Sequence, residues 1–128
     1  KSNPLVARNP EEYDKLLDFI FVEKPFIPGP IKSYLTEVAI ENQDLNKKIF
    51  QLIKDQKLNE PMESLMKNVK TKTFILWGSE DRVLHPSGAK ILGSIAENSK
   101  VTVLKDAGHV PMIEFPERTA KLYFEFLK

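Results

Sequence analysis

Two residues with acid–base chemistry, Asp81 and His109, each follow a short apolar segment in the second half of the chain. Asp81 lies three residues after Gly78 in the segment WGSEDRVLHP, and His109 lies in DAGHVPMIEFP. Loops that leave neighbouring parallel strands, roughly 5 to 10 Å apart, emerge at one edge of a sheet and bring such side chains into hydrogen-bonding reach. The sequence therefore predicts a carboxylate that orients and charges an imidazole, an arrangement used in general acid–base catalysis.

The elements that must position this pair alternate between strand and helix. Thr73–Trp77 (TFILW) and Lys100–Leu104 (KVTVL) are β-prone apolar runs. Ser87 is placed to cap a helix that extends to about Glu97, and Pro116 opens a last helix. This order predicts a parallel pair of strands with a right-handed crossover, in a doubly wound α/β sheet. Two strands alone leave long unpaired edges, so further strands are expected outside this chain.

The first half of the chain has helical periodicity. Asn9, followed by Pro10 and two acidic residues, is typical of a helix N-cap. The three prolines of Lys24–Pro30 (KPFIPGP) stop this helix and form an apolar elbow. Further helices are expected over Ile31–Glu41, Asp44–Lys57 and Leu58–Val69. Because each helix has one apolar stripe, we expect them to lie on another surface, and we divide the chain into a helical cap or lid segment, residues 1–70, and a C-terminal α/β segment, residues 71–128.

The composition excludes several classes of protein. Among 128 residues, 19 Lys and Arg face 18 Asp and Glu, and the net charge of +1 gives no field that attracts nucleic acid. The apolar runs are shorter than the ~20 residues of a transmembrane helix. There is no cysteine and there are two histidines, so thiolate chemistry is excluded and a metal site is disfavoured. The start at Lys1, without a signal sequence, indicates an internal or processed piece and leaves the compartment unknown.

Several other residues have both a functional and a structural interpretation. Asp106 shares the loop of His109 and is an alternative acid, although a solvated turn position suits it better. His85 is expected in a surface loop rather than at the entrance of a site. Glu114 is expected to support the histidine loop or to cap the last helix, and Trp77 to lie in the core rather than to contact substrate.

The apolar residues of the first half also have two interpretations. Phe26 and Ile27 of the elbow, together with Met62, Leu65 and Met66, either line an acyl pocket or pack between the helices and the body of the protein. Packing is the more frequent role for apolar residues at these spacings.

Longer segments of the chain resemble a known family. FILWGSEDRVLHPSGAKIL and KVTVLKDAGHVPMIEFPERTAKLYFEFL look like the C-terminal portion of the α/β-hydrolase superfamily, where one strand ends in an acid-bearing W-G-x-x-D loop and the next in G-H. NPEEYDKLLDFIFVEKPFIPGPIKSYL resembles the helical cap of bacterial lipases and esterases related to the monoacylglycerol-lipase-like branch. The resemblance covers essentially the whole chain and implies the C-terminal part of a doubly wound α/β-hydrolase sheet preceded by an all-helical cap.

The resemblance implies a role for each matched residue. Asp81 takes the place of the triad acid and His109 that of the general base, whereas no serine of this sequence stands in a G-x-S-x-G elbow. The implied function is that of the C-terminal fragment of a serine hydrolase that cleaves carboxylic esters, such as acylglycerols or other lipid-like esters. Phe26 and Ile27 are then candidate substrate contacts. No metal or organic cofactor is implied.

Two alternatives remain open on the sequence alone. Epoxide, haloalkane and carbon–carbon bond hydrolases of the same fold keep the acid and the histidine, and a non-catalytic binding module can keep the whole framework. The expected partners are a small lipid-like ester and either the N-terminal half of the same protein or, for the isolated chain, a second copy of itself. The isolated chain is expected to be inactive because it lacks a nucleophile and oxyanion donors.

Overall fold

The computed structural model describes residues 3–55 and 61–128, which form two compact units. So far as these residues are described, the first unit comprises Lys1–Phe19 and Lys24–Asn59, and the second comprises Ile20–Glu23 and Glu60–Lys128. The segment Ile20–Glu23 therefore packs with the second unit, although helical residues of the first unit precede it. This placement matters for the histidine loop described below.

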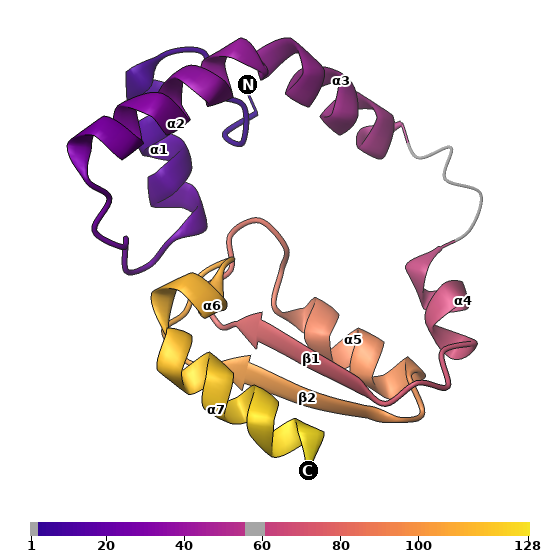
Figure 1. Ribbon diagram of the computed structural model, residues 1–128. Helices are drawn as coiled ribbons and strands as arrows, with labels where there is room; N and C mark the ends of the chain where they lie inside the picture. Colours follow the sequence, from indigo (N-terminus) through magenta and orange to yellow (C-terminus); the bar gives the residue numbers. More distant parts are fainter. Residues whose placement is uncertain (1–2, 56–60) are drawn as a thin grey trace. The chain divides into compact units, whose positions relative to one another are not determined.

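The first unit is helical, with α1 (Pro10–Ile20, of which Ile20 packs with the second unit), α2 (Gly29–Glu41) and α3 (Gln43–Lys54) (Figure 1). The expected N-cap is confirmed, because Oδ1 of Asn9 accepts a hydrogen bond of 2.9 Å from the backbone N–H of Glu12. The proline-rich elbow lies between α1 and α2, as predicted, but its last two residues, Gly29 and Pro30, already form the first turn of α2.

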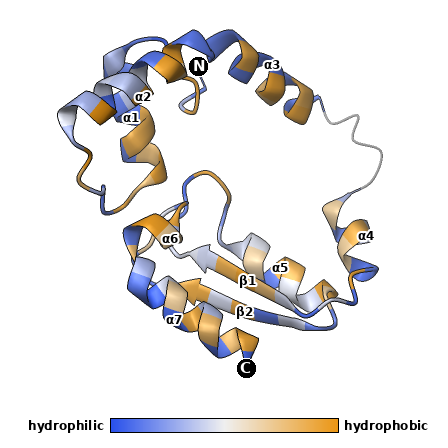
Figure 2. Cartoon of the chain, in the orientation of Figure 1, coloured by the Kyte–Doolittle hydropathy of each residue, from blue (hydrophilic) through white to orange (hydrophobic). Residues whose placement is uncertain are grey.

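Side-chain burial differs among these helices. Tyr13 and Leu17 of α1 are buried, and burial raises the pKa of the Tyr13 phenol. Thr36 of α2 is buried too, and its hydroxyl donates to the carbonyl of Lys32 at 2.7 Å. By contrast α3 buries no residue, and Figure 2 shows apolar and polar residues alternating along it.

Over residues 61–128 the second unit has two parallel strands and four helices. Its elements are α4 (Met62–Lys67), β1 (Thr73–Gly78), α5 (Ser87–Ile95), β2 (Ser99–Leu104), α6 (Pro111–Glu114) and α7 (Pro116–Leu127) (Figure 1). The strands pair in register from Thr73 opposite Ser99 to Gly78 opposite Leu104. The predicted strand–helix–strand–helix order and the parallel pairing are confirmed.

Helices α5 and α7 cover opposite faces of this sheet. Gly88 of α5 lies against the ring of Trp77, and Gly93 of the same helix lies against Val101. The ring of Phe126 in α7 stacks on Phe74 with the centroids 5.3 Å apart. Because successive strand residues point to opposite faces, these contacts place the two helices on the two sides of the sheet, which is the doubly wound arrangement.

Some local predictions differ from the structure. Ser87 is the first residue of α5 rather than its cap: Pro86 is the N-cap residue, and the Ser87 hydroxyl lies 2.9 Å from Nδ1 of His85 instead of bonding to the helix N-terminus. The helix α6 was not expected; Pro111 starts it after the histidine loop. The expected helix ending at Lys57 and the expected start of the next at Leu58 lie outside the described residues.

Candidate active site

Asp81 lies in the loop that follows β1 and has a fixed carboxylate. Oδ1 accepts hydrogen bonds from the backbone N–H groups of Val83 and Leu84, at 2.8 and 3.0 Å. Oδ2 lies 3.0 Å from Nδ1 of His109. Only 4% of the Asp81 side chain is exposed, so little water competes for either oxygen. The carboxylate is therefore turned toward the imidazole by the local backbone.

His109 lies in the loop that follows β2, with its ring between protein and solvent. Its backbone N–H donates to the carbonyl of Ile20 at 2.8 Å, and 34% of its side chain is exposed. With the Asp81 carboxylate as acceptor, Nδ1 carries the proton and Nε2 of the neutral ring has a free lone pair. Within the part of the chain that the structure describes, Nε2 has no hydrogen-bond partner. This tautomer can accept a proton at Nε2.

Two glycines allow other backbone segments to approach the histidine loop closely: Gly78 at the end of β1, and Gly108 against the segment Ile20–Glu23. A methyl group on Gly78 would lie 2.7 Å from the carbonyl carbon of Ala107 and closer still to two carbonyl oxygens. A methyl group on Gly108 would lie 2.6 Å from the carbonyl oxygen of Ile20. The W-G and G-H motifs therefore need glycine because backbones meet there, and not because of a positive φ.

Backbone hydrogen bonds join the two loops beyond the ends of the strands. The N–H of Ser79 donates to the carbonyl of Leu104, and the N–H of Glu80 donates to that of Ala107, both at 2.9 Å. The Ser79 hydroxyl accepts from the N–H of Asp106 at 2.9 Å. These bonds extend the strand pairing into the loops, so the positions of Asp81 and His109 depend on one another.

Glu114 of α6 also holds the histidine loop, as the sequence predicts. Its Oε1 accepts from the N–H of Gly108 at 2.7 Å, and its Oε2 accepts from the N–H groups of Val22 and Glu23 at 2.9 Å each. The bonds to Val22 and Glu23 join residues 91 and 92 positions apart, and nothing in the sequence pattern indicates them.

The other candidate residues lie apart from this pair. Asp106 is exposed in the turn after β2, with a φ of 62°, and its carboxylate lies 3.9 Å from Nζ of the neighbouring Lys105. His85 is exposed as well, and its ring contacts Ser87. Trp77 is half-buried, and its indole N–H donates to the carbonyl of Leu84 at 3.0 Å, which is a structural role.

The candidate substrate contacts differ in how far they are exposed. Phe26 is 91% exposed and Ile27 is half-buried. Met62 and Leu65 are exposed on α4, and Met66 is half-buried. A contact between these residues and a substrate stays a prediction.

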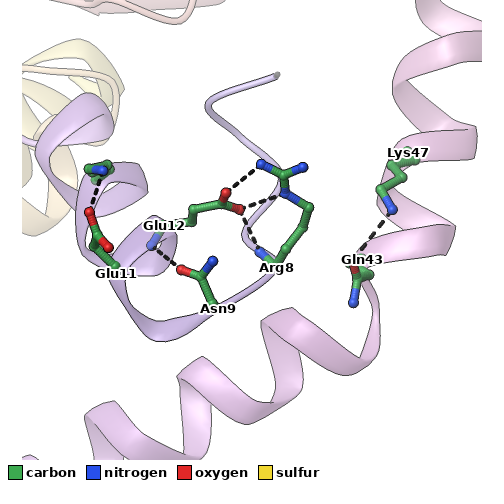
Figure 3. Close-up of polar contacts among 7 residues, drawn as sticks. Arg8, Asn9, Glu11, Glu12, Gln43 and Lys47 are labelled. Atoms are coloured by element: carbon green, nitrogen blue, oxygen red, sulfur yellow. Dashed lines mark hydrogen bonds and ion pairs between the residues drawn. The ribbon is translucent and has the colours of Figure 1, made fainter. Parts of the chain in front are cut away.

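The first unit has a groove of about 640 Å³ among its described residues. Its lining residues are Asn3, Val6, Arg8, Lys47, Phe50, Gln51, Ile53 and Lys54. Figure 3 shows that polar groups near it bond to residues close in sequence: Arg8 and Asn9, which precede α1, bond with Glu12, and Lys47 bonds with Gln43. The groove contains neither the acid–histidine pair nor the elbow residues.

Among residues 3–55 and 61–128, no set of three His, Asp or Glu side chains is placed to hold a metal ion. No helix in those ranges has the length and apolar character needed to cross a membrane.

Comparison with known proteins identifies the class. No family model matches the chain. A solved structure of a bacterial membrane phospholipase A, described as a virulence factor, superposes with a TM-score of 0.91 at 40% identity, over 98% of this chain and 40% of that protein. The doubly wound sheet, the loop-borne acid–histidine pair and this match agree with the resemblance found in the sequence. The chain belongs to the α/β-hydrolase superfamily.

Within that superfamily the curated relatives are lipases. Monoacylglycerol lipase ABHD6 of Mus musculus is 36% identical over 97% of this chain, and Lipase 1 of Psychrobacter immobilis is 29% identical over 98% of it. The chain spans 37% and 39% of the length of these two proteins. This partial coverage fits the predicted C-terminal portion of a lipase or esterase.

Proposed function

We propose that the complete protein is a serine hydrolase of carboxylic esters, with Asp81 as its acid and His109 as its base. The observation that supports this most directly is the 3.0 Å contact between Asp81 Oδ2 and His109 Nδ1, with the opposite carboxylate oxygen held by two backbone N–H groups. Such a pair selects one tautomer of the imidazole and stabilises the imidazolium that forms when the base accepts a proton.

In the proposed first half-reaction, a serine outside this chain attacks the ester carbonyl. Nε2 of His109 removes the hydroxyl proton as the bond from oxygen to carbon forms. Asp81 stabilises the resulting positive ring. When the tetrahedral intermediate collapses, the bond to the alkoxy group breaks and the imidazolium donates its proton to the leaving alcohol. An acyl-enzyme and a neutral histidine remain.

The second half-reaction repeats these steps with water. Nε2 of His109 removes a proton from water as its oxygen attacks the acyl carbonyl, and the imidazolium then returns that proton to the departing serine. The products are a carboxylic acid and the regenerated hydroxyl. The residues of this chain need to move one proton in each direction, which the neutral tautomer and the carboxylate allow.

The proposed substrates are acylglycerols or other lipid-like esters. The names of the relatives, monoacylglycerol lipase and lipase, support this class. The elbow adds a second support, because it presents the aromatic ring of Phe26 with 91% of the residue exposed. An exposed apolar side chain of this kind suits contact with an acyl chain.

The proposal is tested on the complete protein with a monoacylglycerol and with an activated aryl ester. We expect hydrolysis of both, a burst of aryl alcohol from acyl-enzyme formation, and labelling of one serine by an organophosphonate. His109→Ala should abolish all three. His85→Ala is the matched control, since His85 is exposed and bonded to Ser87, and it should leave them intact. Labelling of an aspartate, or hydrolysis that survives His109→Ala, would contradict the proposal.

A further inference from the structure

Glu114 gathers three backbone donors that belong to two separate segments. Gly108, which immediately precedes His109, donates to Oε1 at 2.7 Å. Val22 and Glu23 donate to Oε2 at 2.9 Å each. The carboxylate therefore bridges the histidine loop and the segment Ile20–Glu23, and all three of these bonds come from main-chain N–H groups.

The bridged segment also bonds directly to the histidine loop. The carbonyl of Ile20 accepts from the backbone N–H of His109 at 2.8 Å. Consecutive N–H groups of the loop, those of Gly108 and His109, thus have acceptors supplied by Glu114 and Ile20. Because Gly108 has no room for a side chain on this face, the two segments are in direct backbone contact.

Only a carboxylate satisfies these donors without conflict. An ionised carboxyl group offers acceptor sites alone, whereas the amide of glutamine carries two N–H donors that would face an N–H of the chain. Removal of the side chain would leave Gly108, Val22 and Glu23 with unpaired N–H groups, and Gly108 is buried. We therefore expect the histidine loop to move when these hydrogen bonds are lost.

We infer that Glu114 is a positioning residue for His109: it fastens the histidine loop to Ile20–Glu23 and so sets the imidazole against Asp81. The inference rests on the proposed function, since it assigns Glu114 to the alignment of the same base. Segment Ile20–Glu23 directly precedes the elbow Lys24–Pro30 in the sequence.

The test compares Glu114→Gln with Glu117→Gln in the complete protein. Glu117 is an exposed acid three residues away and is the matched control. For Glu114→Gln we expect kcat to fall about 10- to 100-fold while KM changes by less than about threefold, because the base is displaced rather than the substrate site removed. Glu117→Gln should leave both constants unchanged.

A spectroscopic measurement separates positioning from general destabilisation. The proton shared between Nδ1 of His109 and Asp81 gives a low-field resonance in the proton NMR spectrum, and circular dichroism reports whether each variant is folded. We expect the resonance to persist in Glu117→Gln and to broaden or vanish in folded Glu114→Gln. If Glu114→Gln fails to fold, Glu114→Asp, which keeps the charge on a shorter arm, should give the same loss of kcat and of the resonance.

A folded Glu114 variant with unchanged kcat and an unchanged resonance would overturn the inference. Failure of the proposed function has a different signature: the unsubstituted complete protein would hydrolyse no ester, or its His109→Ala variant would hydrolyse esters as well as the unsubstituted protein does. In that case the NMR resonance alone tests the inference. Its loss in folded Glu114→Gln would support the positioning role, and its persistence would overturn that role.

Discussion

At the scale of single residues, the two oxygens of Asp81 have different partners. One accepts from two N–H groups of its own loop, and the other faces the imidazole. The local bonds restrict rotation of the carboxylate, so its orientation does not depend on the histidine. Asp106, by contrast, is exposed and adopts φ of 62°, a conformation that Asp and Asn tolerate better than most residues.

Replacement of Gly78 by alanine tests the close contact of the two loops. The added methyl group would overlap the backbone of Ala107 and Gly108, which cannot rotate away as a side chain can. We predict that Gly78→Ala lowers the free energy of unfolding of the complete protein by about 3 kcal/mol or more. Urea denaturation measures this change.

Gly29→Ala is the control for that substitution. A methyl group on Gly29, the first residue of α2, meets no atom within 4 Å. Its effect should be neutral or stabilising by less than about 1 kcal/mol, because alanine reduces the entropy of the unfolded chain. Equal losses at positions 29 and 78 would show that the loop contact is not what makes Gly78 necessary.

At the scale of the elements, the N-terminus of α1 has a defined cap. Asn9 accepts from the N–H of Glu12, and the Glu12 carboxylate in turn accepts from the backbone N–H of Arg8 at 3.0 Å (Figure 3). We predict that Asn9→Ala costs about 1 kcal/mol of stability in the complete protein. Asn9→Asp should restore most of it, and a similar loss for both variants would argue against the cap.

The same cap predicts a pH dependence. The hydrogen bond from the Arg8 side chain, together with its charge, lowers the pKa of Glu12 from the ordinary value of 4.5. A carboxyl group with a lower pKa in the folded state contributes stability above 4.5, and this contribution is lost as the pH falls through the folded pKa. Glu12→Gln should therefore destabilise the protein at neutral pH and lose that effect in acid.

The measurement compares unfolding free energies of Glu12→Gln and the unsubstituted protein between neutral and acidic pH. Glu11→Gln is the matched control, since Glu11 is exposed and bonds only to Lys15 in the described structure. A difference for Glu12→Gln that is constant with pH, or that grows in acid, would refute the assignment of the lowered pKa.

The elbow between α1 and α2 gives a prediction about specificity. We predict that Phe26→Ala and Ile27→Ala shift the preference of the complete enzyme among ester chain lengths by about tenfold or more, because ~1 to 3 kcal/mol depends on each apolar contact in the transition state. Short esters should be affected least. An equal loss of kcat/KM for every chain length, accompanied by a lower melting temperature, would show that these residues only pack.

The sequence predicts the regular elements whose signals are local, such as hydrophobic periodicity or a proline. The parallel strands, the cap at Asn9 and the elbow follow from such signals. The helix α6 is too short to show a periodic pattern. Serine is a common N-cap residue, so the sequence favours Ser87 as the cap of α5, whereas the helix has Pro86 at that position. The bonds from Glu114 to Val22 and Glu23 depend on tertiary packing and leave no local pattern.

The candidate site was likewise predictable only where its signals are local in the sequence. Asp81 and His109 were predictable because each occupies the loop after a strand, and parallel topology brings such loops together. The two backbone donors that fix Asp81 depend on the exact course of its loop, which composition does not specify. A groove in the first unit, lined in part by Phe50, has no signature in the sequence either.

At the scale of the whole molecule, this chain exposes surfaces that a larger sheet would cover. Both strands of its two-stranded sheet have an unpaired edge, and Val101 and Val103 of β2 are exposed. We predict that the isolated chain associates or unfolds without a cooperative transition, and that it has no esterase activity. Sedimentation that shows a monomer with a sharp melting transition would contradict the first expectation, and activity lost on His109→Ala would contradict the second.

The most direct test of the account compares two aspartates in the complete protein. Asp81→Asn removes the charge that faces His109, whereas Asp106→Asn removes an exposed charge from the same pair of loops and keeps a residue that tolerates its positive φ. We predict that Asp81→Asn lowers kcat for an ester by roughly three to five orders of magnitude, as loss of a triad acid does elsewhere, and that Asp106→Asn lowers it by less than about threefold. Equal losses at the two positions, or full activity in Asp81→Asn, would contradict the assignment of Asp81 as the acid.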